Sequence, residues 1–322
     1  MFRKAVSYLE DAVVLSDYGG NSLETAASLN NLGSSYLALG DYNRALSCFE
    51  KALSILTDAD NPVWVAATYT NIAGALQDKG ELLKAKEYYE RALKISSELK
   101  DLAIQGKVLN NLGDLNQQSG NLNLSEQYYQ RALKIFTKLG TEEFMAKAEN
   151  NIAVIMLQTN RFEEAEKLFN QALNSRKMDK LDIARIWHNL AYIKLQQGNL
   201  TQAETCLRKS IENKEKLDDQ VGITASLLLM SQVKIAQNNP KEAIKLLKET
   251  AEIQEKLADK RGLMTTFQNL SSLLSKAGDA QNANRFLQAA LKIAYQIGSP
   301  EKEKLEQTLK KNDLESSTKG AE

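Results

Sequence analysis

The chain has 322 residues, of which 43% are hydrophobic and 25% charged, a composition typical of a folded globular protein. Its 41 basic residues are balanced by 41 acidic residues, so it lacks the cationic excess that binding to nucleic-acid phosphates requires. Its apolar runs are shorter than the roughly 20 residues of a membrane-spanning helix. We therefore expect neither a nucleic-acid partner nor a membrane partner.

The first expected element is a helix over residues 2–15 that has no preceding partner helix. Its apolar side consists of Ala5, Leu9 and Ala12. Two explanations are open: the natural chain starts earlier and includes the missing partner helix, or this helix caps the stack. The first is favoured, because a repeat cut in half leaves apolar surface exposed. The same exposed side raises self-association into a homodimer through this helix as an alternative.

Seven helix pairs are then predicted, over about residues 23–297. In each second helix a small residue recurs with a period of 40 residues, apart from one step of 38: Ala5, Ala45, Ala85, Ser125, Ala165, Ala203, Ala243 and Ala283. A bulky residue follows four positions later and a second small residue three positions after that, as in Ala45, Phe49 and Ala52. These spacings place the three residues on one face of a helix.

The first helix of each pair carries its own small residue, as at Gly33 and Ala73. Such residues allow two helices to approach closely. Each first helix is predicted to end at a residue that tolerates a left-handed conformation: Gly40, Gly80, Gly120, Asn160, Gly198, Asn238 and Gly278.

The C-terminal region is predicted to contain one more helix. Ser299 and Pro300 form a typical helix start, and the thin apolar stripe of Leu305 and Leu309 suits a capping helix over residues 299–311. The polar segment 312–322 is expected to be disordered. Residues 1–298 would then form one repeat domain.

At this point the chain resembles the tetratricopeptide repeat (TPR) family. The segment Leu29–Tyr36, followed by Gly40-Asp41-Tyr42 and by Ala45, Phe49 and Ala52, matches the family pattern. The period of 40 exceeds the usual 34 and is similar to that of kinesin light chains, spindle-orientation adaptors and bacterial peptide-sensing regulators. The resemblance implies an all-α solenoid of antiparallel helix pairs in a right-handed superhelix, with the first helices lining a concave groove.

Within that implied groove, one column consists almost entirely of asparagines, interrupted by Leu229: Asn31, Asn71, Asn111, Asn151, Asn189 and Asn269. An asparagine amide has both donors and an acceptor, so a ladder of them can pair with an extended peptide backbone. Two other interpretations stay open. The amides can stabilise the packing of neighbouring first helices, or they can simply be solvated.

One turn earlier, three successive repeats carry a cation: Lys107, Lys147 and Arg185. These residues would make the central groove basic and would attract an acidic ligand or a terminal carboxylate. Ordinary solvated charges are the alternative. His188 lies beside Asn189 and is included in the predicted peptide-binding groove.

The sequence lacks the catalytic and nucleotide-binding motifs that are recognised by their residue spacing. A single histidine excludes the HExxH motif, and neither a GxxxxGK[ST] nor a GxGxxG loop occurs. We predict no enzymatic activity, no catalytic residues, no metal site and no cofactor. Cys48 and Cys206 occupy equivalent positions of different repeats, so we expect two buried, reduced thiols and a cytoplasmic protein.

The sequence therefore predicts a non-catalytic interaction scaffold or adaptor that binds an extended peptide of a partner protein in its concave groove. One alternative is a regulatory peptide sensor that lacks an effector domain. The other is a self-assembling structural repeat protein.

Overall fold

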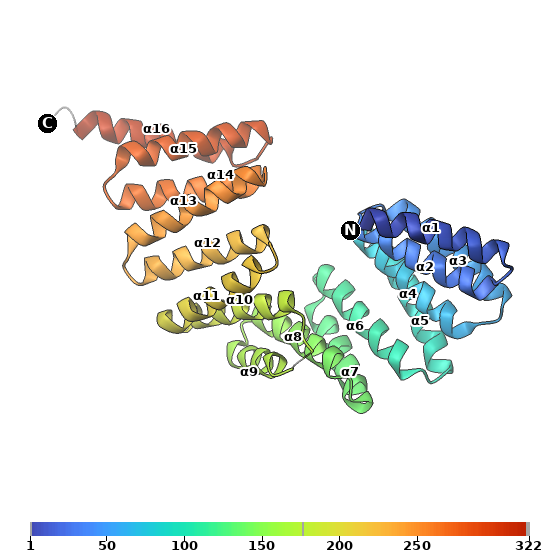
Figure 1. Cartoon of the computed structure of the whole chain (residues 1–322). Coiled ribbons are helices and arrows are strands. Elements are labelled where there is room, and N and C mark those ends of the chain that lie inside the picture. The colour runs from blue at the N-terminus through green and yellow to red at the C-terminus, as the bar shows by residue number, and fades with distance from the viewer. Residues whose placement is uncertain (1, 176, 320–322) are drawn as a thin grey trace. The chain divides into compact units, whose positions relative to one another are not determined.

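A computed structural model describes residues 2–175 and 177–319; side chains are described for residues 6–175 and 177–310. The chain is 84% helical, and its described part contains helices and turns but no strand. Consecutive helices run antiparallel within each of two compact units, residues 1–177 and 178–322 (Figure 1). The predicted all-α class is confirmed.

Unit 1 contains one unpaired helix followed by four pairs: α1 (Phe2–Tyr18), α2 (Ser22–Ala38), α3 (Tyr42–Asp58), α4 (Pro62–Asp78), α5 (Leu82–Glu98), α6 (Leu102–Gln118), α7 (Leu122–Leu139), α8 (Glu142–Gln158) and α9 (Phe162–Leu173). Unit 2 contains three pairs and one further helix: α10 (Lys180–Gln196), α11 (Leu200–Glu215), α12 (Gln220–Ala236), α13 (Pro240–Lys256), α14 (Lys260–Lys276), α15 (Ala280–Gln296) and α16 (Lys302–Lys319).

The division between the units falls at the irregular step of the repeat. Helix α9 has 12 residues, whereas α7 has 18 and α8 has 17. Its early end at Leu173 accompanies the 38-residue spacing between Ala165 and Ala203.

The two terminal helices differ in length from the prediction. Helix α1 continues to Tyr18, three residues beyond the expected end. Helix α16 begins at Lys302. It follows a turn in which the Ser299 hydroxyl accepts a hydrogen bond from the Glu301 amide. The helix continues to Lys319, so residues 312–319 of the expected disordered tail are helical. No glycine or proline interrupts this segment. Residues 320–322 lie outside the described part.

The core of each pair depends on a bulky side chain of the second helix lying against a small residue of the first. Phe49 is fully buried, and a Cβ added to Gly33 would lie 2.5 Å from its ring. Tyr129 approaches Gly113 equally closely. A side chain at either glycine would force the two helices apart.

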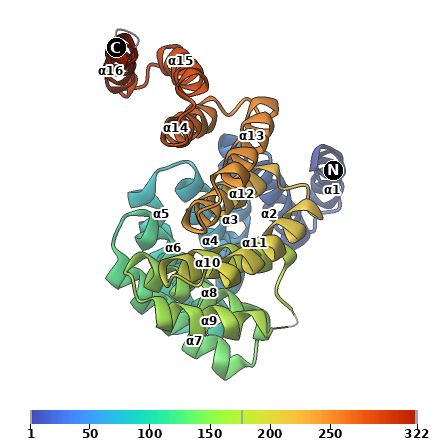
Figure 2. The ribbon, with the colours of Figure 1, turned by 90° about the vertical axis from the view of Figure 1, so that its left-hand side faces the viewer.

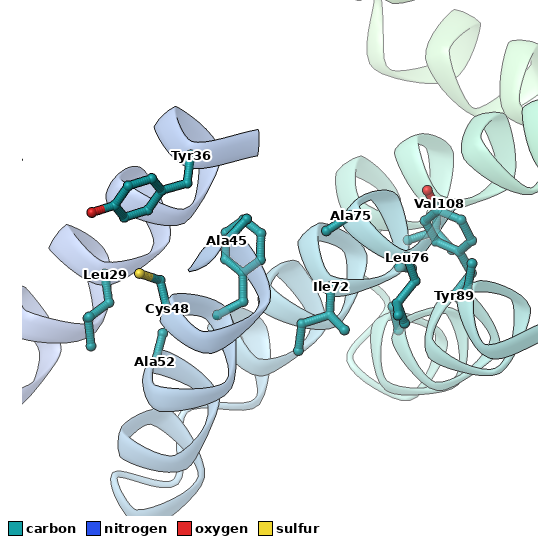
Figure 3. Close-up of a cluster of buried hydrophobic side chains, with 14 of the residues drawn as sticks. Leu29, Tyr36, Ala45, Cys48, Ala52, Ile72, Ala75, Leu76, Tyr89 and Val108 are labelled. Atoms are coloured by element: carbon teal, nitrogen blue, oxygen red, sulfur yellow. The ribbon is translucent and has the colours of Figure 1, made fainter. Parts of the chain in front are cut away.

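The small residues of the second helices are buried in the same layer. Ala45 and Ala52 have no exposed surface, and they lie beside Leu29 and Ile72 in the core of unit 1 (Figure 3). The side chain of Ala5 lies outside the described residues. Cys48 is 9% exposed within this core, and burial raises the pKa of its thiol. Cys206 is also a buried free thiol, within unit 2, as predicted.

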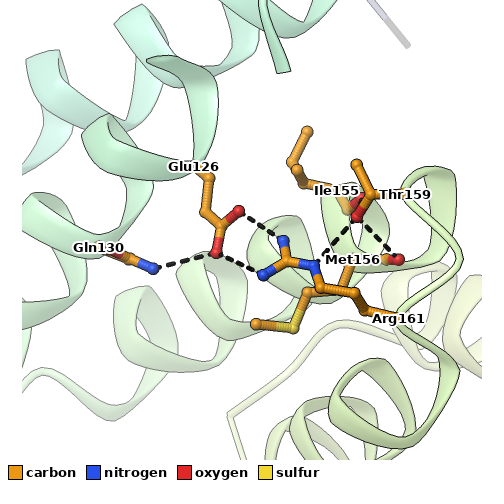
Figure 4. Close-up of polar contacts among 6 residues, drawn as sticks. All are labelled: Glu126, Gln130, Ile155, Met156, Thr159 and Arg161. Carbon is orange, nitrogen blue, oxygen red and sulfur yellow. Dashed lines mark hydrogen bonds and ion pairs between the residues drawn. The ribbon is translucent and has the colours of Figure 1, made fainter. Parts of the chain in front are cut away.

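An ion pair connects successive repeats at the end of unit 1. The two terminal nitrogens of Arg161 contact the two carboxylate oxygens of Glu126, at 2.5 and 3.3 Å (Figure 4). Gln130 donates to the same carboxylate and Arg161 Nε donates to Thr159, so the pair has a fixed geometry. Glu204 occupies the equivalent position in unit 2 and accepts hydrogen bonds from Lys234 and Gln237.

The turns explain the regular stops in the sequence. All seven predicted stop residues have positive φ, from 57° at Asn238 to 90° at Gly80. The turns that follow second helices also use this conformation, and two of them place an unsuitable residue there, Lys100 with φ of 56° and Ala258 with φ of 55°. A left-handed conformation costs a residue with a Cβ roughly 1–2 kcal/mol.

We predict that Ala258→Gly increases the free energy of unfolding by about 0.5–1 kcal/mol, because relief of the strain exceeds the entropy that glycine adds to the unfolded chain. Chemical denaturation followed by circular dichroism measures this change. Ala277→Gly is the matched control, since Ala277 has φ of −80° and its replacement should destabilise. Equal destabilisation by both substitutions would contradict the prediction.

Candidate functional site

The predicted site residues lie on the first helices, on a surface that we call the ladder face. In unit 1 it is formed by α2, α4, α6 and α8, and in unit 2 by α10, α12 and α14. Asn31 on α2 of unit 1 and Asn269 on α14 of unit 2 are exposed, whereas the other ladder members are half-buried: Asn71, Asn111, Asn151 and Asn189. The two halves of the ladder face are described separately.

In unit 1 the asparagines pair across neighbouring first helices. Asn71 Nδ2 on α4 donates to Asn30 Oδ1 on α2 at 3.2 Å. Asn151 Nδ2 on α8 donates to Asn110 Oδ1 on α6 at 3.3 Å. These contacts at Asn71 and Asn151 therefore support the interpretation that the amides stabilise the packing of neighbouring first helices. Asn111 differs, because it is not paired with a described residue of another first helix; its amide lowers the pKa of the Tyr89 hydroxyl, which burial raises overall.

The pairing determines which groups remain available to a ligand. Asn151 Nδ2 also donates to Asp114 Oδ1 at 3.4 Å, so this amide nitrogen is fully engaged. At Asn71 one amide hydrogen is engaged by Asn30. The side-chain oxygens of Asn71 and Asn151 have no partner within the described residues, and they could accept hydrogen bonds from the N–H groups of a bound peptide.

Asp114 is the half-buried charge of this network. Its carboxylate accepts hydrogen bonds from the Tyr129 hydroxyl at 2.5 Å and from Asn110 Nδ2 at 3.4 Å. Burial raises the pKa of Asp114 to about 6, although the hydrogen bond from Tyr129 lowers it in part. Asp114 was not among the site residues predicted from the sequence. The Asn-Asn doublets at residues 30–31, 110–111 and 150–151 were the available signal for the network.

The two predicted lysines of unit 1 converge on one aromatic ring. Lys107 Nζ on α6 lies 5.3 Å from the centre of the Phe144 ring, and Lys147 Nζ on α8 lies 5.9 Å from it. Lys147 also forms an ion pair with Glu143 at 2.8 Å. Lys107 is exposed. The adjacent first helices therefore bring both ammonium groups to one half-buried ring beside the Asn110–Asn151 pair.

In unit 2, Arg185 and His188 have different surroundings. Arg185 is exposed and forms an ion pair with Asp182 at 3.6 Å. His188 is half-buried, and its Nδ1 lies 3.2 Å from the Ser226 hydroxyl, to which the buried Lys214 donates at 2.8 Å. Burial, and secondarily the Lys214 charge, lower the pKa of His188 to about 4. His188 therefore belongs to a buried polar cluster rather than to an open face.

The described residues contain no cluster of three or more acidic, histidine or cysteine side chains that could hold a metal ion. Among the helices that the structure describes, none has the length and apolarity required to cross a membrane.

The family model of the MalT-like TPR region matches residues 5–299. The chain belongs to this family. The match covers both units, and it confirms the resemblance to tetratricopeptide repeats. No curated protein matches the chain.

Solved structures of other repeat proteins share the fold. A Signal Transduction ATPase with Numerous Domains from Pyrococcus horikoshii, which has a tetratricopeptide repeat sensor, is 16% identical; the match covers 97% of this chain and 50% of that one, with a TM-score of 0.72. The apo quorum sensor NprR from B. thuringiensis is 13% identical over 90% of this chain and 98% of its own, with a TM-score of 0.59.

A third similar structure contains a ligand. It is the Rap conjugation gene regulator of the plasmid pLS20 in complex with the Phr peptide. It is 18% identical, and the match covers 88% of this chain and 78% of that one, with a TM-score of 0.58. These low identities establish the fold alone.

We predict that Asp114→Asn increases the free energy of unfolding at pH 7 by about 1–3 kcal/mol, because it removes a half-buried charge of raised pKa. The folded protein favours the protonated carboxyl, so the contribution of Asp114 to stability is lost as pH rises from about 4 to about 6. Urea denaturation should therefore show no difference between variant and wild type at pH 4. Asp11→Asn, at an exposed position of α1, is the control. A variant less stable than wild type at pH 7 would contradict the prediction.

Proposed function

We propose that the protein is a non-catalytic scaffold that binds an extended, acidic peptide segment of a partner protein along the ladder face of unit 1. The observation that carries the proposal is the convergence of Lys107 and Lys147 on the Phe144 ring, beside the paired amides of Asn110 and Asn151. Cations over an aromatic ring offer an acidic side chain both charge and an apolar contact.

The backbone of such a peptide has donors that match the ladder. The side-chain oxygens of Asn71 and Asn151 accept hydrogen bonds, and the N–H groups of an extended peptide supply them at regular intervals. The resemblance to tetratricopeptide proteins supports the same use of the first helices, since repeats of this type generally serve as scaffolds without catalytic activity. The buried thiols of Cys48 and Cys206 are consistent with a cytoplasmic location, which we retain as part of the proposal.

We predict that Lys107→Glu weakens binding of an acidic peptide at least tenfold, through loss of one charge-assisted contact and addition of a repulsive one. The peptide would be selected from a displayed random library on the whole chain, and fluorescence anisotropy would measure its dissociation constant at two salt concentrations. The affinity of wild type should fall as salt increases, and that of the variant should fall less.

Lys94→Glu is the matched control, because Lys94 is exposed on the second helix α5, away from the ladder face. Equal effects of the two substitutions, or failure of the library to give any binder, would overturn the proposal. Asn151→Ala separates binding from packing: it should lower the stability of unit 1 by about 1 kcal/mol, because it breaks the contacts between α8 and α6.

A regulatory peptide sensor is the second candidate of this kind. Its support is the shared fold with the quorum sensor NprR and with the Rap regulator bound to a Phr peptide. In a sensor, the bound peptide must alter the repeat stack. Small-angle X-ray scattering with and without the selected peptide distinguishes the two candidates, because a simple scaffold should give the same curve in both states.

Self-association is favoured by one specific observation on α1. This helix exposes four large apolar side chains: Tyr8 at 74%, Val14 at 67%, Leu15 at 72% and Tyr18 at 96%. In α3 the equivalents of Tyr8 and Leu15 are covered by neighbouring helices, because Cys48 is buried and Ile55 is half-buried. A second copy of the chain could cover the exposed side of α1 in the same way.

We predict that the molar mass measured by light scattering rises with protein concentration, and that Tyr8→Ser combined with Leu15→Ser abolishes the rise. Leu83→Ser is the control, because Leu83 is 83% exposed on α5 and lies away from α1. A monomer at every concentration would exclude self-association through α1.

A further inference from the structure

The C-terminal part of unit 2 contains a cavity between α14, α15 and α16, the three helices seen together in Figure 2. Its volume is about 660 Å³, which lies within the range of small-molecule sites. Leu287 and Leu305, each 5% exposed, form its apolar part. Asn269 of the ladder and its neighbour Gln268 also line it.

One residue that lines the cavity on α14 is small where the other first helices carry a large one. The equivalent position of the other six first helices carries a long or branched residue: Leu37, Gln77, Gln117, Leu157, Leu195 and Ile235. In unit 1 two of these residues bridge neighbouring first helices, Gln77 to Gln118 and Gln117 to Gln158. In α14 the position is Ser275, which is too short to fill the space before α16.

The hydroxyl groups of the cavity are available to a ligand. Serines elsewhere on the first helices donate to the carbonyl four residues earlier, as Ser34 does to Asn30 at 2.9 Å and Ser35 to Asn31 at 3.0 Å. Ser271, Ser272 and Ser275 form no side-chain hydrogen bond within the part of the chain that the structure describes. Ser271 is only 6% exposed as a whole residue, and it lines the cavity with a hydroxyl that has no hydrogen-bond partner among the described residues.

The charged groups of the cavity favour an anion. Lys276 of α14 and Lys304 of α16 line its two sides, and neither forms an ion pair with a described residue. The opposing charge is Glu301, whose carboxylate accepts a hydrogen bond from Gln268 Nε2 at 2.7 Å. The cavity is therefore lined by two ammonium groups and three hydroxyl donors. Its described lining has only one carboxylate, and that group already accepts a hydrogen bond.

We propose that this cavity binds a small ligand that carries an oxyanion, either a phosphate or a carboxylate. The hydroxyls of Ser271, Ser272 and Ser275 donate hydrogen bonds to its oxygens, Lys276 and Lys304 balance its charge, and Leu287 and Leu305 contact its apolar part. The site is independent of the peptide proposed for unit 1, because none of its residues belongs to that unit.

Titration of the ¹⁵N-labelled chain with inorganic phosphate and, separately, with succinate tests the proposal, with sodium chloride at equal ionic strength as the reference. We expect saturable amide shifts in residues 268–276 and 301–308 with at least one of the two probes. The probe that binds more tightly identifies the oxyanion. Absence of saturation with both probes at about 20 mM, well beyond a millimolar dissociation constant, would overturn the proposal.

Two substitutions tie binding to the cavity. Ser275→Leu fills it with the residue found at positions 37, 157 and 195, and should abolish binding while the fold is retained. Ile235→Leu makes the matched change at the equivalent position of α12 and should leave binding unchanged. Lys304→Gln should weaken binding about tenfold through loss of one charge-assisted contact, and it serves as the second variant if Ser275→Leu fails to fold. Binding that survives both cavity substitutions would show an adventitious ion only and would exclude the site.

Discussion

The close contact between a ring or branched side chain of each second helix and a small residue of its first helix determines the rest of the structure. Where Phe49 lies against Gly33, or Tyr129 against Gly113, the two helices approach so closely that an added Cβ would collide with the ring. This approach fixes which side of each first helix is buried. The opposite side becomes the ladder face, so the direction of the asparagines and lysines follows from the packing of the pair.

That same constraint explains why the fold could be predicted from the sequence. The recurrence of a small, a bulky and a second small residue is a local pattern, as in Ala45, Phe49 and Ala52, and it repeats with little variation. The positive φ angles at Gly40 and Asn160 are equally local, because they depend on one residue and its helix end. The lengths of the terminal helices were not predictable in this way. They depend on weak preferences such as those of residues 312–319.

The site was predicted less completely, and the reason is geometric. A period of 40 residues correctly aligns equivalent positions, but the side chains that meet between two neighbouring first helices occupy non-equivalent positions. The paired asparagines are therefore 41 residues apart, as in Asn30 with Asn71 and Asn110 with Asn151. The column of asparagines was visible in the sequence, whereas its pairing depends on which sides of neighbouring first helices meet. The cavity beside α16 required the position of a helix outside the repeat, and only the absence of a large residue at Ser275 could have indicated it.

The tandem arrangement also has a consequence for the way in which the chain acquires its structure. The hydrogen bonds between neighbouring first helices join residues 37 to 41 positions apart, such as Asn30 with Thr68 and with Asn71. The chain therefore closes only short loops, and ordering one repeat requires little more than the repeat that follows it. During synthesis, the pair α2–α3 can be completed before the later repeats have left the ribosome. A protein of this kind reaches its structure by successive local steps, with no stage at which distant parts of the chain must find each other.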